Sequence, residues 1–183
     1  MANKMLIVQG AGEGAHLEDK ALADYLETAL GPEYKTTYPE FPGLENVAYD
    51  VWKDQIEGEL EKLGDGGIIV AHSLGGSALL KYLSEEATAF AIAGLFLVAP
   101  PYKGKDGEWG TDDFAMDAGA ASDLPAAMPI FIYHSRDDEW VPFSHLAQWV
   151  GKVPGAVART FDDRGHSFTG TDFVELVDDI RAL

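Results

Sequence analysis

The chain of 183 residues has 13 Lys and Arg against 31 Asp and Glu, which gives a formal net charge of −18 and a pI near 4.4. Such a charge repels phosphate backbones and anionic lipid headgroups, so we expect no nucleic-acid binding and no membrane binding. The absence of cysteine excludes disulfides, thiol catalysis and cysteine-bound metals. Hydrophobic residues make up 46% of the sequence, enough for one folded domain over residues 1–183.

The first apolar stretch of the chain runs only from Met5 to Val8. A signal peptide has a longer apolar region, and a membrane-spanning helix needs about 20 apolar residues. We therefore expect a cytoplasmic protein.

Short apolar runs recur along the chain and predict six strands, at residues 5–9, 36–38, 67–71, 94–99, 129–134 and 157–160. Between the runs, apolar residues follow helical spacing, as Leu22, Leu26 and Ala29 do. This alternation predicts a three-layer α/β fold with about six mostly parallel strands and helices on both faces. Ligands of such folds bind at the carboxyl ends of the strands.

The connection between the fourth and fifth predicted strands, at about residues 100–128, is longer than a compact domain normally needs. It predicts a small cap insertion with a short helix near residues 112–118. A small cap implies a shallow pocket, whose candidate lining residues are Trp109, Phe114 and Trp140. Each of these side chains is equally compatible with ordinary core or surface packing.

The segment AHSLGG at residues 71–76 lies between a predicted strand and a predicted helix. A nucleophile elbow has this context, because a tight turn there lifts a Ser hydroxyl above the sheet. Ser73 is therefore the candidate nucleophile, with Ala71 in place of the usual first Gly. The alternative is that Ser73 only caps the helix.

A Ser nucleophile needs a base and an acid that orients the base. His166 follows the last predicted strand, and two neighbouring carboxylates, Asp137 and Asp138, follow the fifth. The order Ser, Asp, His is that of α/β-hydrolases. The acid in that pattern stands four positions before the Pro of a Val-Pro pair, and counting back from Pro142 favours Asp138 over Asp137.

The loop after the first strand, residues 9–15, completes the predicted site. An oxyanion hole in this fold combines the N–H of the residue after the nucleophile, here Leu74, with one from this loop, here Ala11. The same loop also fits G-x-G-x-x-A, a fingerprint of dinucleotide-binding oxidoreductases. Such a site wants an acidic residue ending the second strand, and Glu33 and Glu40 are poorly placed for that role.

The sequence resembles the small serine hydrolases of the retinoblastoma-binding protein nine type, a compact branch of the α/β-hydrolase superfamily. The resemblance covers nearly the whole chain and is carried by AHSLGG, by RDDEWVP at residues 136–142 and by FDDRGHSF at residues 161–168. It implies a six-stranded sheet without the usual initial antiparallel hairpin, a triad of Ser73, Asp138 and His166, and no metal or organic cofactor. Ala71 and Leu74 depart from the family pattern.

These observations predict a carboxylesterase-like serine hydrolase that cleaves a small-molecule ester, with a thioester or an activated amide as other substrates of the same chemistry. The alternative from another class is a protein-interaction module on a hydrolase fold with little turnover, although no sequence feature indicates a protein partner. The dinucleotide-binding oxidoreductase is a remote alternative. Fold alone does not decide between them.

Overall fold

A parallel sheet is the centre of the protein in the computed structural model, which describes residues 2–42, 47–86, 88–103, 113–117, 119–125, 127–169 and 172–183. Its strands, in the spatial order β2-β1-β3-β4-β5-β6, are all parallel to their neighbours. They are β1 (Asn3–Val8), β2 (Tyr34–Thr37), β3 (Gly67–His72), β4 (Ile92–Val98), β5 (Ile130–Ser135) and β6 (Val157–Phe161). The six predicted strands and the predicted α/β class are confirmed.

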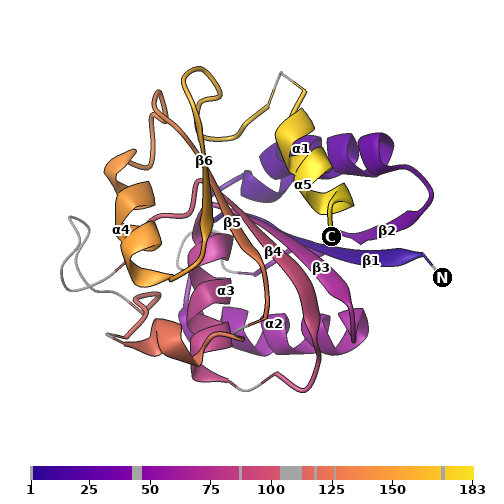
Figure 1. Cartoon of the computed structure of the whole chain (residues 1–183), viewed down its shortest axis with the longest axis horizontal. Coiled ribbons are helices and arrows are strands. Elements are labelled where there is room, and N and C mark those ends of the chain that lie inside the picture. The colour runs from indigo at the N-terminus through magenta and orange to yellow at the C-terminus, as the bar shows by residue number, and fades with distance from the viewer. Residues whose placement is uncertain are drawn as a thin grey trace.

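Helices cover both faces of the sheet. They are α1 (Ala15–Leu30), α2 (Tyr49–Leu63), α3 (Leu74–Glu85), α4 (Ser144–Lys152) and α5 (Val174–Arg181). Figure 1 shows α1 and α5 on one face and α2, α3 and α4 on the other. Because side chains alternate along a strand, Met5 and Ile7 of β1 pack with α1 and α5, whereas Leu6 and Val8 pack with α2 and α3.

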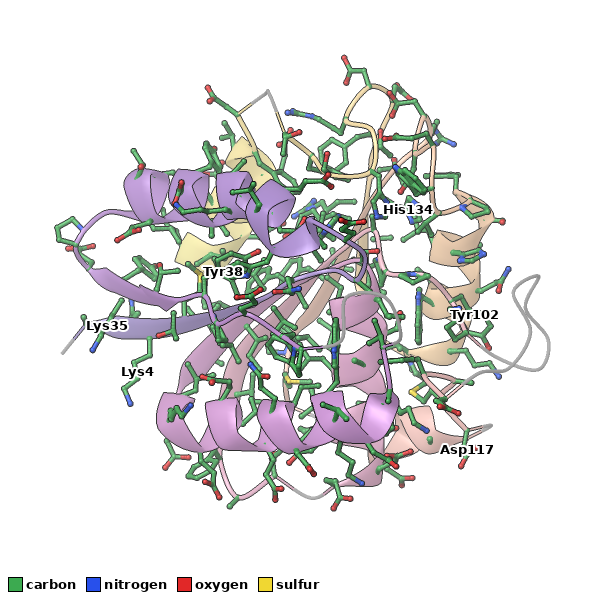
Figure 2. The ribbon with its side chains drawn as sticks, turned by 180° about the vertical axis from the view of Figure 1, so that it is seen from behind. Lys4, Lys35, Tyr38, Tyr102, Asp117 and His134 are labelled. Atoms are coloured by element: carbon green, nitrogen blue, oxygen red, sulfur yellow. The ribbon has the colours of Figure 1, made fainter. Side chains whose placement is uncertain are left out.

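The parallel direction of the strands brings their carboxyl ends to one edge of the sheet. His134, near the end of β5, and Lys4, near the start of β1, lie toward opposite ends of the sheet (Figure 2). The loops that follow β1, β3, β5 and β6 therefore meet at the same edge, and these loops, together with the first residue of α3, carry all the predicted triad and oxyanion residues. No helix among the described residues is long and apolar enough to cross a membrane.

The connection between β4 and β5 differs from the prediction in its described part. Residues 113–117 are turn and irregular backbone instead of the predicted helix, and a short 3-10 helix, η1 (Ala120–Asp123), follows them. Gly119, with φ of 91°, precedes η1, and this left-handed conformation does not continue an α-helix. The helix η1 packs against α3.

Candidate active site

Ser73 lies in the turn between β3 and α3 and has a backbone conformation that is rare for a residue with a side chain. Its φ is 49° and its ψ is −128°. The turn is held by a hydrogen bond from the Ser73 N–H to Val98 O and by one from the Gly76 N–H to Ser73 O. Among the described residues, the Ser73 side chain makes no capping bond to α3. These features are those of a nucleophile elbow and argue against a simple helix cap.

Glycine at position 75 allows the first turn of α3 to approach the loop after β1. A Cβ atom at Gly75 would lie 2.3 Å from the main-chain oxygen of Gln9 and 2.9 Å from a methyl group of Val8. No side chain fits at that separation from backbone. The close approach brings Ser73 next to the loop that contains the predicted oxyanion donor Ala11.

A chain of hydrogen bonds joins Ser73, His166 and Asp138. The Oγ atom of Ser73 lies 3.0 Å from Nε2 of His166. On the other side of the ring, Nδ1 of His166 lies 2.9 Å from Oδ2 and 3.0 Å from Oδ1 of Asp138. The structure therefore brings the three predicted triad residues together, although 93 positions separate Ser73 from His166.

The carboxylate of Asp138 is fully buried and accepts several hydrogen bonds besides that of His166. Its Oδ1 accepts from the N–H groups of Trp140 at 2.9 Å and Val141 at 2.8 Å. Burial alone would raise the pKa of this carboxyl, but hydrogen bonds from His134, His166 and the Val141 N–H lower it below its ordinary value. Asp138 therefore stays ionised and able to orient His166.

His134 is a neighbour of the site that the sequence did not identify as one. Its Nε2 lies 3.2 Å from Asp138 Oδ2 and 3.0 Å from the main-chain oxygen of Val141. Both neighbours accept hydrogen bonds, so Nε2 carries a proton. The sequence shows His134 only as a residue at a strand end, but its ring is completely buried and supports the carboxylate of Asp138.

The other candidate acid, Asp137, hydrogen-bonds Ser135 and the main chain of Gly165, whereas Asp138 hydrogen-bonds the His166 ring. The Oδ1 atom of Asp137 accepts from Ser135 Oγ at 2.5 Å and from the Gly165 N–H at 2.9 Å. The hydrogen bonds from Ser135 and Gly165 lower the pKa of Asp137. Asp137 thus holds the loop that carries His166, while Asp138 holds the His166 ring.

A cleft of about 500 Å³ opens onto Ser73 and His166. Its lining includes Gly10, Ala11 and Gly12 from the loop after β1, together with Trp140 and Val141. Of the described residues between 100 and 128, Pro101 and Lys103 line this cleft. The Trp149 Nε1–H donates to Pro100 O, and the Ser77 Oγ–H donates to Pro101 O, so α3 and α4 fix this part of the wall.

The three predicted pocket residues have different positions. Trp140 lines the cleft and is 71% exposed, so it lies at the rim. Phe114 is not among the described residues that line the cleft. Its ring is buried edge-to-face against Tyr49 and Trp52, at centroid separations of 5.6 and 5.9 Å, because α2 offers an apolar aromatic surface there. Trp109 lies outside the described residues.

Both predicted oxyanion donors belong to residues that line the cleft. Leu74 is the first residue of α3, so its N–H has no acceptor within the helix. The loop of Ala11 is anchored by the fully buried Gln9, whose Oε1 accepts from the Phe41 N–H at 3.0 Å and contacts His16 Nδ1 at 2.8 Å. This support keeps the loop close to the elbow.

A second acid–histidine pair, Asp19 and His72, lies beside the first, and the sequence reasoning missed it. The two side chains are almost fully buried, and His72 Nδ1 lies 2.8 Å from Asp19 Oδ1. Asp19 Oδ2 accepts from the Gly10 N–H at 2.6 Å, and His72 Nε2 lies 3.1 Å from the main-chain oxygen of His166. The rings of His72 and His166 are 4.8 Å apart.

The described residues give little support to a metal site or to a dinucleotide site. They contain no group of three or more His, Asp or Glu side chains that could hold a metal ion. The loop at residues 10–15 does precede a helix, as a dinucleotide fingerprint requires, but β2 ends at Thr37 and Tyr38 follows it. The acidic residue that would bind a ribose is therefore not at the end of β2.

Residues 34–175 match the serine hydrolase family. No curated protein sequence matches the chain significantly. Among solved structures, the ydeN gene product of B. subtilis has a TM-score of 0.75 at 20% identity, and the match covers 99% of this chain and 98% of that chain. The meta-cleavage product hydrolase CumD, in a variant form, has a TM-score of 0.74 at 14% identity, with 98% and 90% covered.

The esterase RhEst1 from Rhodococcus sp. ECU1013 is also similar, with a TM-score of 0.69 at 15% identity over 99% of this chain and 87% of that chain. At these identities the likeness concerns the fold. The protein therefore has the α/β-hydrolase fold, as the sequence predicted.

Proposed function

This chain belongs to the serine hydrolase family, and on that premise we propose that it cleaves a small ester through an acyl-enzyme on Ser73. The observation that carries the proposal is the hydrogen-bonded chain from Ser73 Oγ through His166 to Asp138, at the mouth of a cleft. Thioesters and activated amides share the acyl chemistry and are the other substrates to test. We propose further that its specificity is that of a carboxylesterase and that it is a serine hydrolase of the retinoblastoma-binding protein nine type.

In the proposed reaction, His166 Nε2 removes the proton of Ser73 as Oγ attacks the acyl carbonyl. Asp138 keeps the Nδ1 proton of His166 directed toward itself and stabilises the imidazolium that forms. The N–H groups of Leu74 and Ala11 hold the negative oxygen of the tetrahedral intermediate. His166 then gives the proton to the leaving group, and water activated by the same base releases the acid and restores Ser73 Oγ–H.

The dimensions of the cleft support a small substrate. A volume of about 500 Å³ lies in the lower part of the range typical of small-molecule sites, and the glycines and alanines of the loop after β1 leave room near Ser73. Glu13 and Glu18 also line the cleft, with Lys103 as a cationic neighbour. The acidic chain and these carboxylates disfavour anionic acyl donors, so we propose a neutral, short-chain ester in the cytoplasm.

The test is labelling with a fluorophosphonate probe, which reacts with activated serines, followed by hydrolysis of p-nitrophenyl acetate. We expect the wild-type protein to be labelled at Ser73 and to hydrolyse the ester, and Ser73→Ala to lose both, with a turnover loss on the order of 10⁶. Ser84→Ala is a matched control, because Ser84 also lies in α3 and its hydroxyl donates to Lys81 O, away from the cleft lining. Labelling that persists in Ser73→Ala would refute Ser73 as nucleophile, and an unlabelled wild-type protein would favour the interaction-module alternative.

A further inference from the structure

His72 faces two hydrogen-bond acceptors. Its Nδ1 lies 2.8 Å from the carboxylate of Asp19, and its Nε2 lies 3.1 Å from the main-chain oxygen of His166. A carbonyl oxygen and a carboxylate oxygen only accept. A neutral imidazole beside an ionised Asp19 would therefore place a nitrogen lone pair against one of them. A proton on each ring nitrogen pairs the charged ring with the Asp19 carboxylate and lets Nε2 donate to His166 O.

The alternative arrangement moves one proton to Asp19 and makes both side chains neutral. The hydrogen bond from the Gly10 N–H to Asp19 Oδ2, at 2.6 Å, opposes this because it stabilises the carboxylate. Burial would raise the pKa of Asp19, but the charge of His72 and contacts with His72 and Gly10 lower it. Burial would likewise lower the pKa of His72, but the charge of Asp19 and the contacts with Asp19 and His166 O raise it. The ionised pair is thus the favoured state.

This pair connects three parts of the proposed active site. Asp19 comes from α1 and holds Gly10, the residue before the oxyanion candidate Ala11. His72 ends β3 next to Ser73, and it holds the main chain of His166. A Cβ atom at Gly10 would lie 3.1 Å from Ser73 Cβ and 3.3 Å from His72 Nδ1, so the loop after β1 and the end of β3 are in close contact there.

We propose that Asp19 and His72 form a buried ion pair that positions the oxyanion loop and the His166 loop around Ser73. This inference rests on the proposed function, and the two are positioning residues because neither takes part in the proton transfers. The titratable groups around His72 are Asp19 from α1, His166 from the loop before α5 and Asp138 from the loop after β5. A misplacement of about 1 Å in an active site can cost about 100-fold in rate.

The first measurement leaves the protein unchanged. Nitrogen-15 NMR of the histidine rings reports whether each ring nitrogen carries a proton. We expect His72 to be protonated at both Nδ1 and Nε2 at pH 7, whereas in Asp19→Asn it should carry one proton. A singly protonated His72 in the wild-type protein at pH 7 would overturn the ion pair, whatever the enzymatic activity.

The second measurement is the steady-state hydrolysis of p-nitrophenyl acetate. We expect Asp19→Ala to lower kcat about 10- to 100-fold with KM changed less than about threefold, because it frees the Gly10 N–H and the His72 ring. Asp19→Asn should recover most of this loss. Its amide oxygen still accepts from the Gly10 N–H, and its NH₂ group donates to Nδ1 of a neutral His72. The Nε2–H of His72 still donates to His166 O.

Asp179→Ala is the matched control. Asp179 is also buried and paired, with Arg159 and the Tyr133 hydroxyl, but it lies on α5 and does not line the cleft. It should lose stability in urea without a change in kcat beyond about twofold. If Asp19→Ala does the same, the pair is only structural and the positioning role is wrong. If the wild-type protein fails to react with the fluorophosphonate, the proposed function is wrong and the positioning role with it, while the NMR result still decides the ion pair.

Discussion

Replacement of Asp138 by Asn tests the proposed triad through the proton on His166. In the wild-type protein, Asp138 Oδ1 accepts from two main-chain N–H groups, those of Trp140 and Val141. In Asp138→Asn the amide oxygen would keep these two bonds, because an NH₂ group there would face two main-chain donors. At the Oδ2 position it faces only the Nε2–H of His134, which can still donate to Val141 O. The NH₂ group of the variant therefore takes the Oδ2 position, 2.9 Å from His166 Nδ1.

An NH₂ group at that position donates to Nδ1 and forces the proton of a neutral His166 onto Nε2. The ring then donates toward Ser73 Oγ and no longer accepts its proton. The same substitution in a triad of this kind costs about 10⁴ in turnover, and we expect about 10³ to 10⁴ here. Since each factor of ten corresponds to about 1.36 kcal/mol, the transition state loses about 4 to 5.5 kcal/mol.

The assay compares kcat/KM for p-nitrophenyl acetate and the rate of fluorophosphonate labelling in Asp138→Asn and Asp137→Asn, with urea unfolding to verify that both variants are folded. Asp137→Asn is the matched control, because its amide oxygen still accepts from Ser135 and Gly165. It should keep its activity within about fivefold. A wild-type rate in Asp138→Asn, or a larger loss in Asp137→Asn, would refute the tautomer argument.

Three further outcomes are expected. The value of kcat/KM should be greatest for neutral aryl esters with acyl chains of about two to six carbons, and a steady rise toward long chains, at about 0.8 kcal/mol per buried methylene, would contradict the small cleft. Gly75→Ala should destabilise the protein by about 1 to 3 kcal/mol in urea, since its Cβ would lie 2.3 Å from Gln9 O, whereas Gly58→Ala in α2, with nothing within 4 Å, should be neutral or stabilising. The pKa of Asp19 is lowered on folding, so Asp19 adds stability above its unfolded-state pKa of about 3.9, and this stability is lost as pH falls through the folded-state pKa. The pKa of His72 is raised on folding, so His72 adds stability below its unfolded-state pKa of about 6.5, and this stability is lost as pH rises through the folded-state pKa. The stability difference between wild type and Asp19→Asn should therefore be larger at pH 5 than at pH 9, and a difference that grows toward pH 9 would contradict the ion pair.

The elements around the site were predictable because each has a local cause in the sequence. Counting back from Pro142 favours Asp138 as the acid, and the structure supplies the reason for that spacing. The carboxylate of Asp138 accepts the N–H groups two and three positions ahead, so the turn ends where Pro142, which has no N–H, follows. The elbow is recognisable for a similar reason, because the small residues at positions 71, 75 and 76 leave space for a tight turn.

The Asp19–His72 pair was not predictable from local pattern, because its partners lie far apart in the sequence and meet only through the packing of α1 against the sheet. One signal was nevertheless present. Asp19 lies on the buried face of α1 with Leu22, Ala23 and Leu26, where a carboxylate requires a partner. The sequence pattern of α1 does not identify that partner. Phe114 packs against Tyr49 and Trp52 of α2, since an aromatic residue in a connection can join the core as easily as a cleft.

The end of β3 explains why two acid–histidine pairs lie so close together. His72 is the last residue of β3 and is buried against Asp19, whereas Ser73 lies in the turn that follows and contacts the His166 ring. His166 then meets both residues, through its ring at Ser73 and through its main-chain oxygen at His72. The ring orientation therefore depends on Asp138, and the loop position depends on Asp19, through His72, as well as on Asp137. Because the two supports act on different atoms of His166, loss of the first should change its tautomer, and loss of the second should change its distance from Ser73.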